Sequence, residues 1–156
     1  MKIVQPPYSL SEIENSFSVF LAGSIEMGIA ENWQETIINE LEQYNNGYIL
    51  NPRRENWDST WQQVKENPQF SEQVNWELEA LEKASMIVFY FSPETKSPVS
   101  MLELGLFAQS KKVVVCCPNG FWRKGNIDIV CQRYNIKQVN TINELIKEIK
   151  QKNQLI

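Results

Sequence analysis

Short hydrophobic runs recur along the chain and predict the strands of a sheet. A continuously apolar run of about four to eight residues, bounded by turn residues, is typical of a strand that is buried on both faces. The three longest runs have this character, and two shorter segments complete the set. The five predicted strands are Phe17–Ala22, Tyr48–Leu50, Met86–Phe91, Val113–Cys117 and Lys137–Val139.

Between the runs, apolar residues return at helical spacing. Ser71 and Ser97 are the expected N-caps of two of these helices, and Pro98 stands in the first turn of the second, where proline is favoured. The segment between Pro52 and Pro68 is polar and is predicted as a long loop. The predicted helices are residues 32–44, 71–84, 97–110, 127–134 and a charged C-terminal segment from about residue 141.

Strands that alternate with helices predict a parallel sheet with helices on both faces. The expected fold is α/β, a flavodoxin-like three-layer α/β/α sandwich with a five-stranded parallel sheet of order 2-1-3-4-5. The whole chain, 1–156, is predicted to form one domain. Ligands bind such sheets beyond the carboxyl ends of the strands, where the strand order reverses. The loops expected there are 23–31 and 92–97.

Charge and hydropathy exclude several partners. The 156 residues contain 15 Lys and Arg against 19 Asp and Glu, a net charge of −4. No basic run is present, so nucleic-acid binding is not expected. No apolar stretch has the roughly 18 residues that a membrane span needs. The N-terminus lacks a charged-then-apolar signal pattern, so a cytoplasmic location is expected.

The absence of histidine removes much catalytic chemistry. Without histidine there is no Ser-His-Asp or Cys-His catalysis and no histidine zinc site. The three cysteines, Cys116, Cys117 and Cys131, lack CxxC spacing and are read as small buried side chains in a reducing compartment. No metal site and no cofactor are expected. Acid–base work would therefore fall mainly to carboxylates, hydroxyls, Lys or Tyr.

One carboxylate stands in an unusually apolar helix. Residues 97–110 carry a single charge, Glu103, and their apolar residues cover nearly the whole helix circumference. A helix that is apolar all round is expected to be buried. Because an ionised carboxylate is costly to bury alone, Glu103 is expected either to face a cleft or to have a specific partner.

A second carboxylate is predicted on the inner face of the preceding helix. Of the four glutamates in residues 71–84, Glu77 falls in the apolar arc that includes Val74 and Leu81, and the other three point to solvent. A salt bridge at the helix edge is the alternative reading. Two inward carboxylates suggest a glycosyl transfer in which one carboxylate attacks a sugar carbon and the other handles the leaving group's proton. Ser97 and Ser100, at a helix N-terminus, are candidates to hold a phosphate or a 5′-hydroxyl.

Three segments resemble the nucleoside 2-deoxyribosyltransferase-like family: FLAGS (20–24), WELEALEKASMIVFYF (76–91) and SPVSMLELGLFA (97–108). The resemblance extends over about residues 17–120. It implies a flavodoxin-like fold and cleavage of N-glycosidic bonds of nucleosides or nucleotides. It also implies that Glu103, in the ELG motif, is the nucleophile and that Glu77 assists at the base.

The resemblance includes departures that bear on the substrate. Glu77 stands where transferases of the family have Asp, and Ser85 stands where an Asp is often found. Ser97 lies six residues before the nucleophile, as does a serine in family hydrolases that act on 5′-monophosphates, whereas transferases tend to have Asp there.

Further substrate contacts follow from the same mechanism. Gly23 permits close backbone approach after the first strand, and Ser24 would touch the sugar or the phosphate. Aromatic side chains are candidates to stack on the base, and charged loop residues are candidates for the phosphate and the base edge, although a solvated loop is the plainer reading. These candidates are Trp33, Trp57, Trp61, Arg53, Arg54 and Asp58.

The predicted function is cleavage or transfer at the N-glycosidic bond of a (deoxy)nucleoside or nucleoside 5′-monophosphate. The alternative is a non-catalytic nucleotide-binding module on the same fold. A flavodoxin-type electron carrier is a third reading, and the loop GSIEMGIAEN (23–32) lacks the Ser/Thr-rich cradle that flavin phosphate would need. A P-loop enzyme is not expected because no Gly-Lys-Ser/Thr follows the first strand. The expected partners are a small nucleoside or nucleotide and further copies of the chain in a homodimer or larger homo-oligomer.

Overall fold

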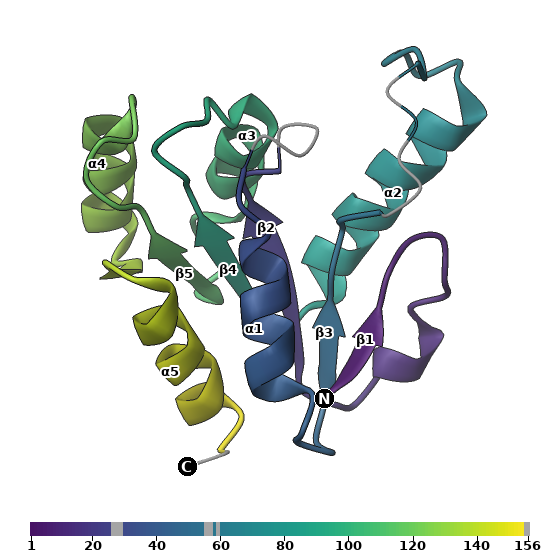
Figure 1. The fold of residues 1–156 in the computed structure, drawn as a ribbon, viewed down its shortest axis with the longest axis horizontal. Helices are drawn as coiled ribbons and strands as arrows, with labels where there is room; N and C mark the ends of the chain where they lie inside the picture. Colours follow the sequence, from purple (N-terminus) through teal and green to yellow (C-terminus); the bar gives the residue numbers. More distant parts are fainter. Residues whose placement is uncertain (26–29, 55–57, 59, 155–156) are drawn as a thin grey trace.

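The computed structural model describes residues 1–25, 30–54, 58 and 60–154. Six parallel strands form one sheet in the order β1-β3-β2-β4-β5-β6, so the predicted parallel α/β architecture is confirmed (Figure 1). The strands are β1 (Lys2–Val4), β2 (Ser18–Gly23), β3 (Tyr48–Leu50), β4 (Met86–Tyr90), β5 (Val113–Cys116) and β6 (Lys137–Val139).

The predicted count of five strands is wrong by one edge strand. β1 pairs in parallel with β3, with Lys2 opposite Tyr48 and Val4 opposite Leu50. The other five strands have the predicted order 2-1-3-4-5 when they are numbered among themselves. Unlike the other three-residue strands, β1 has turn residues on one side only, and its pairing with the free edge of β3 makes this segment a strand.

Helices cover both faces of the sheet. The Trp33, Leu41, Leu145 and Ile149 side chains bring α1 and α5 against one face. The Trp76, Leu104 and Ile127 side chains bring α2, α3 and α4 against the other. Two buried hydrophobic clusters, one on each face, therefore make the three-layer sandwich. The helices are α1 (Trp33–Leu41), α2 (Pro68–Lys83), α3 (Pro98–Phe107), α4 (Lys124–Tyr134) and α5 (Ile142–Lys152), with a short 3-10 turn at Ser11–Ile13.

Helix α2 begins earlier than expected. Its N-cap is Asn67, whose side chain accepts a hydrogen bond from the backbone N–H of Phe70, and Pro68 follows in the first turn. The predicted cap, Ser71, lies inside the helix. Asn followed by Pro is the stronger start signal because Asn satisfies a free N–H and Pro has none to satisfy.

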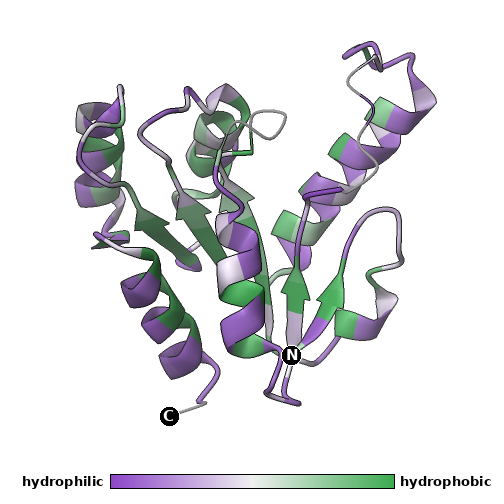
Figure 2. Ribbon diagram, viewed as in Figure 1, coloured by the Kyte–Doolittle hydropathy of each residue, from purple (hydrophilic) through white to green (hydrophobic). Residues whose placement is uncertain are grey.

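Helix α3 is not buried all round, which corrects a third expectation. Val99, Leu102 and Leu106 are 59%, 65% and 60% exposed, whereas Glu103 and Leu104 are buried. Figure 2 shows the hydrophobic strands at the centre and mixed hydropathy on the helices around them. None of the described helices has the length and hydrophobicity to cross a membrane.

Candidate active site

The strand order reverses between β2 and β4, the first and third predicted strands, as expected. β2 pairs with β3 on one side and with β4 on the other, and Gly23 lies opposite Tyr90 at the carboxyl ends. The chain leaves β2 into residues 24–32, of which 26–29 lie outside the described residues. It leaves β4 through residues 91–97 and then enters α3 (Figure 1). This edge of the sheet is where open parallel sheets bind ligands.

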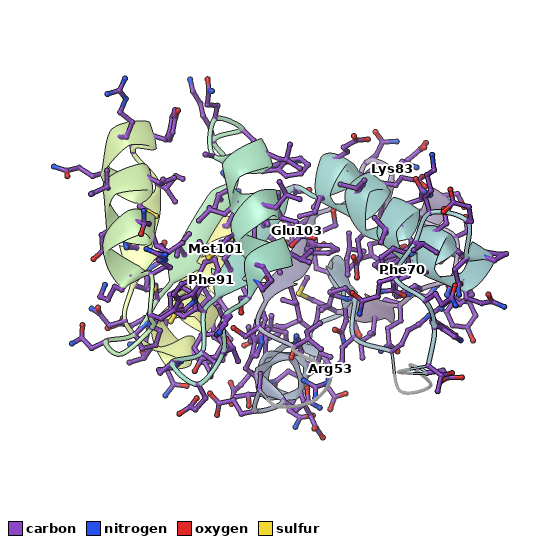
Figure 3. The ribbon with its side chains drawn as sticks, turned by 90° about the horizontal axis from the view of Figure 1, so that it is seen from above. Arg53, Phe70, Lys83, Phe91, Met101 and Glu103 are labelled. Atoms are coloured by element: carbon purple, nitrogen blue, oxygen red, sulfur yellow. The ribbon has the colours of Figure 1, made fainter. Side chains whose placement is uncertain are left out.

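Glu103 is buried with its carboxyl group between two helices. It lies on α3, is 8% exposed, and points toward α2 when the molecule is seen from above (Figure 3). Among the described residues it has no hydrogen bond and no ion pair. Burial, followed by the negative charge of Glu77, raises the pKa of the Glu103 carboxyl to about 8. A carboxyl group that is mostly neutral at pH 7 thus sits beside a second acidic side chain.

Glu77 faces inward from α2, as predicted. The buried face of that helix, however, is not centred where it was expected. The buried positions are Gln73, Trp76, Ala80 and Leu81, and Leu78 is 36% exposed. Glu77 is half-buried and accepts a hydrogen bond of 2.7 Å from Nε2 of Gln73. Burial raises the pKa of the Glu77 carboxyl, and this bond and the charge of Arg54 oppose the rise.

The two arginines that follow β3 point to different faces of the sheet. The Arg54 side chain is 7% exposed and turns to α2, where its Nη2 lies 3.1 Å from Oε2 of Glu72. Its Nε also donates to the carbonyl of Pro6 at 3.3 Å. Arg53 lies on the α1 side, with Nη1 3.4 Å from Oε1 of Gln34 (Figure 3). Arg54 is therefore the arginine whose charge reaches Glu77.

Three buried hydroxyls tie the ends of β2 and β4 together. Oγ of Ser24 lies 2.7 Å from Oγ1 of Thr95 and 2.7 Å from Oγ of Ser97, and these last two atoms are 2.9 Å apart. Ser24 also accepts from the N–H of Ser92 at 2.9 Å. Ser97 is the residue before α3, as predicted, but its side chain does not cap the helix. It has left-handed backbone angles and joins this hydroxyl cluster instead.

Gly23 is needed because the backbone of the neighbouring strand, β4, approaches it closely. Its φ is +137°, and a Cβ built there would lie 2.2 Å from the carbonyl oxygen of Tyr90. The backbone of Ser24 then donates to that same oxygen at 2.9 Å. Gly23 thus lets β2 and β4 stay paired to their ends, where the hydroxyl cluster begins.

The remaining predicted residues are distributed around this edge. Ser100 is buried one turn before Glu103. Asp58 is exposed and accepts from the backbone and hydroxyl of Thr60. Trp33 belongs to the core, because it is 1% exposed and its Nε1 donates to the carbonyl of Ser24. Trp57 lies outside the described residues.

Two polar residues of this edge, Gln73 and Thr95, were not predicted from the sequence. Gln73 lies one turn before Glu77 on the same inward face, and this spacing was a usable signal. Thr95 sits in an irregular loop, where no periodicity assigns a direction to a side chain. No three acidic or cysteine side chains gather as a metal site would require within the described part of the chain.

Surface depressions occur elsewhere without comparable chemistry. One is lined by residues 13–17 together with Lys83 and Ser85, at the amino ends of β2 and β4. Its charged side chains, Glu14 and Lys83, are on the surface. The buried carboxyl pair, and not the depth of a depression, therefore marks the candidate site.

The doubly wound parallel sheet places this chain among the open-sheet α/β proteins, and Glu77 and Glu103 give it an acidic candidate site. Within this class, the family model "nucleoside 2-deoxyribosyltransferase like" matches residues 16–121, more than half of the chain. The protein belongs to the nucleoside 2-deoxyribosyltransferase-like family. The resemblance inferred from the sequence is thereby confirmed.

A solved structure supports the fold. A conserved protein from Enterococcus faecalis V583 superposes with a TM-score of 0.61 at 14% identity, over 88% of this chain and 99% of that one. At this identity the likeness concerns the fold alone. A search of curated proteins found no significant match.

Proposed function

We propose that the protein cleaves or transfers at the N-glycosidic bond of a (deoxy)nucleoside or nucleoside 5′-monophosphate, with retention of configuration. One observation carries the proposal: a buried carboxyl group on α3, Glu103, without an ion-pair partner among the described residues, lies near a second carboxyl group, Glu77, on α2. Retaining glycoside chemistry uses two such groups, one as nucleophile and one as acid. Membership of the family supports the same chemistry.

In the proposed mechanism, the ionised Glu103 carboxylate attacks the anomeric carbon as the bond to the base breaks, which forms a glycosyl ester. Glu77 donates a proton to the departing base. Water or a second base then attacks the anomeric carbon and gives its proton to the Glu77 carboxylate, while the bond from that carbon to Glu103 breaks and regenerates the Glu103 carboxylate. The proposed substrate-binding residues are Gly23, Ser24, Ser97, Ser100, Arg53, Trp57 and Asp58. Of these, Ser100 shares the buried face of α3 with Glu103, and Ser24 and Ser97 shape the site through the hydroxyl cluster.

The first test replaces the nucleophile. Glu103→Gln keeps the size of the side chain and removes its charge, so base release from nucleosides and monophosphates should fall by on the order of 10³-fold or more. Free base is measured by chromatography over a substrate library. Glu79→Gln, an exposed glutamate of α2, is the matched control and should retain native activity. Activity that survives Glu103→Gln would remove Glu103 from the nucleophile role.

Covalent trapping tests the intermediate directly. A fluorinated arabinosyl nucleoside should add the mass of its sugar to Glu103, as read by mass spectrometry of peptides. An unlabelled protein, after turnover of a natural substrate is demonstrated, would contradict a covalent step. Tight nucleotide binding without base release, in the native protein and in Glu103→Ala alike, would instead identify a binding module.

We further propose that the protein forms a homodimer or larger homo-oligomer, as the family resemblance implies. Sedimentation equilibrium measures this directly. A monomer at concentrations well above those used for activity would contradict it.

A further inference from the structure

The polar environments of Glu77 and Glu103 are unequal. Glu77 receives an N–H from Gln73 and lies near the positive charge of Arg54, which comes from the segment after β3. Glu103, the titratable group that faces it from α3, receives neither within the described ranges. Glu72, which is also on α2, is exposed and paired with Arg54. Donors and positive charge stabilise the ionised form of a carboxyl group, so Glu77 is the easier of the two to ionise and Glu103 keeps its proton to higher pH.

Gln73 is the residue that creates this inequality through a hydrogen bond. It is 4% exposed, and its Nε2 lies 2.9 Å from the carbonyl oxygen of Pro52 and 2.7 Å from Oε1 of Glu77. Both of these oxygens are acceptors when Glu77 is ionised, so only the NH₂ end of the amide can stand between them. Each of its two hydrogens then has one acceptor. The amide orientation follows from the chemistry of its neighbours.

The other end of the same amide has no partner. Oε1 of Gln73 is buried and makes no hydrogen bond to any residue that the structure describes. A buried, unsatisfied acceptor costs free energy, and a hydrophobic side chain of the same size would avoid that cost. A glutamine at this position is therefore poorly explained by packing and well explained by its two N–H groups.

We propose that Gln73 is a positioning residue that holds the Glu77 carboxylate ionised and anchored to the Pro52 carbonyl, so that Glu103 is the member of the pair that carries a proton before substrate binds. The chemical meaning of this inference rests on the proposed function. Its observable consequence, the order in which the two carboxyl groups titrate, does not.

In the proposed reaction, this placement sets the order of proton movement. The O–H bond of Glu103 breaks and the proton passes to the Glu77 carboxylate, which leaves the total charge of the pair unchanged. The freed Glu103 carboxylate forms its bond to the anomeric carbon while the bond from that carbon to the base nitrogen breaks. The electron pair of the broken bond remains on the base, which takes the proton from Glu77. Glu77 thus acts as base toward Glu103 and then as acid toward the leaving group.

The native protein provides the first test. The side-chain amide resonances of Gln73 are followed by two-dimensional ¹H–¹⁵N NMR through a pH titration, alongside the ¹³C carboxyl resonances of Glu77 and Glu103. Assignments come from Glu77→Gln and Glu103→Gln. We expect the Gln73 amide to shift with the midpoint of Glu77, and Glu77 to ionise at lower pH than Glu103. A pH-invariant Gln73 amide, or the reverse order of ionisation, would overturn the proposal.

A substitution provides the second test. Gln73→Met keeps the length of the side chain and removes both N–H groups, so the midpoint of Glu77 should rise by on the order of one pH unit. The midpoint of Glu103 should fall, because a neutral Glu77 no longer repels its charge. Gln34→Met is the matched control, since Gln34 is equally buried and contacts Arg53 instead. Midpoints that stay unchanged in Gln73→Met, or that move equally in both variants, would contradict the role of Gln73.

These measurements separate this inference from the proposed function. The titrations require no turnover. If the titrations are as expected but the protein never releases base, the positioning role of Gln73 is supported and the proposed function is wrong. If the protein releases base through Glu103 but the Gln73 amide does not respond to pH, the proposed function is supported and the positioning role of Gln73 is wrong. If Gln73→Met fails to fold, the titration of the native protein still decides.

Discussion

Burial of the Glu103 carboxyl group couples its protonation to the stability of the folded chain. In the unfolded chain the group titrates near its ordinary pKa of 4.5, and in the folded chain burial and the charge of Glu77 raise that pKa to about 8. Between these pH values the folded protein binds a proton that the unfolded chain has released. The free energy of unfolding therefore falls as the pH rises through this window.

Glu103→Gln should remove this pH dependence. Through this group, the native protein should lose on the order of 2–4 kcal/mol of its free energy of unfolding as the pH rises from 5 to 8. The variant should not show this loss, because glutamine has no proton to lose. Urea denaturation at both pH values measures the difference. A difference between the two proteins that is the same at both pH values would show that the Glu103 carboxyl is not held neutral by burial.

At the scale of single elements, a lysine on the loop before β5 closes the C-terminus of α2. Nζ of Lys112 donates to the carbonyl oxygens of Leu81, Glu82 and Ala84 at 2.7, 2.8 and 3.1 Å. These carbonyls have no partner within the helix, and a positive charge is favourable at a helix C-terminus. The contact joins α2, which carries Glu77, to the strand that follows α3.

Lys112→Met should destabilise the fold. The variant keeps the aliphatic stem and loses the charged donor, so the free energy of unfolding should fall by about 1–2 kcal/mol. Thermal and urea denaturation measure the change. The neighbouring Lys111 is exposed, and Lys111→Met should leave stability nearly unchanged. Equal effects of the two substitutions would contradict the assigned contact.

Element boundaries depended on signals of unequal strength. Three residues, Tyr48–Leu50, were enough to predict β3 because turn residues stand on both sides, and Lys137–Val139 was likewise placed correctly. The start of α2 was missed because the helix begins in the predicted polar loop, at an Asn-Pro pair with no apolar period before it. The exposed face of α3 contradicts its apolar composition. The composition of a helix does not show which of its faces is buried, because the neighbouring elements determine that face.

At the scale of the whole molecule, the segment before β2 completes the fold beyond the family's matched region. Residues 1–15 precede that region, yet β1 extends the sheet and Leu10 and Ile13 enter the core beside α2. Nε1 of Trp76 donates to the carbonyl of Tyr8 at 2.8 Å and holds this segment against α2. The segment therefore supports the helix that presents Glu77.

Leu10→Ala should show how much this segment contributes. Leu10 is 3% exposed, so its truncation should cost about 2–4 kcal/mol of stability through lost burial and a cavity. Tyr8→Ala is the control within the same segment, because the Tyr8 side chain is 72% exposed and only its carbonyl is used. A loss below about 0.5 kcal/mol in Leu10→Ala, as measured by denaturation, would mean that the segment is not part of the cooperative core.

Local pattern was sufficient for the architecture and for the two carboxylates. Continuous apolar runs define buried strands without knowledge of their partners. Helical spacing placed Glu77 on an inward face, and Glu103 was singled out as the one charge in an apolar helix. Contacts between distant segments had no such signal. The edge strand β1, the bridge from Gln73 to Pro52 and the cluster of Ser24, Thr95 and Ser97 each join residues far apart in the chain. Which acid keeps the proton depends on those contacts, since burial and neighbouring donors exist only after the elements have packed.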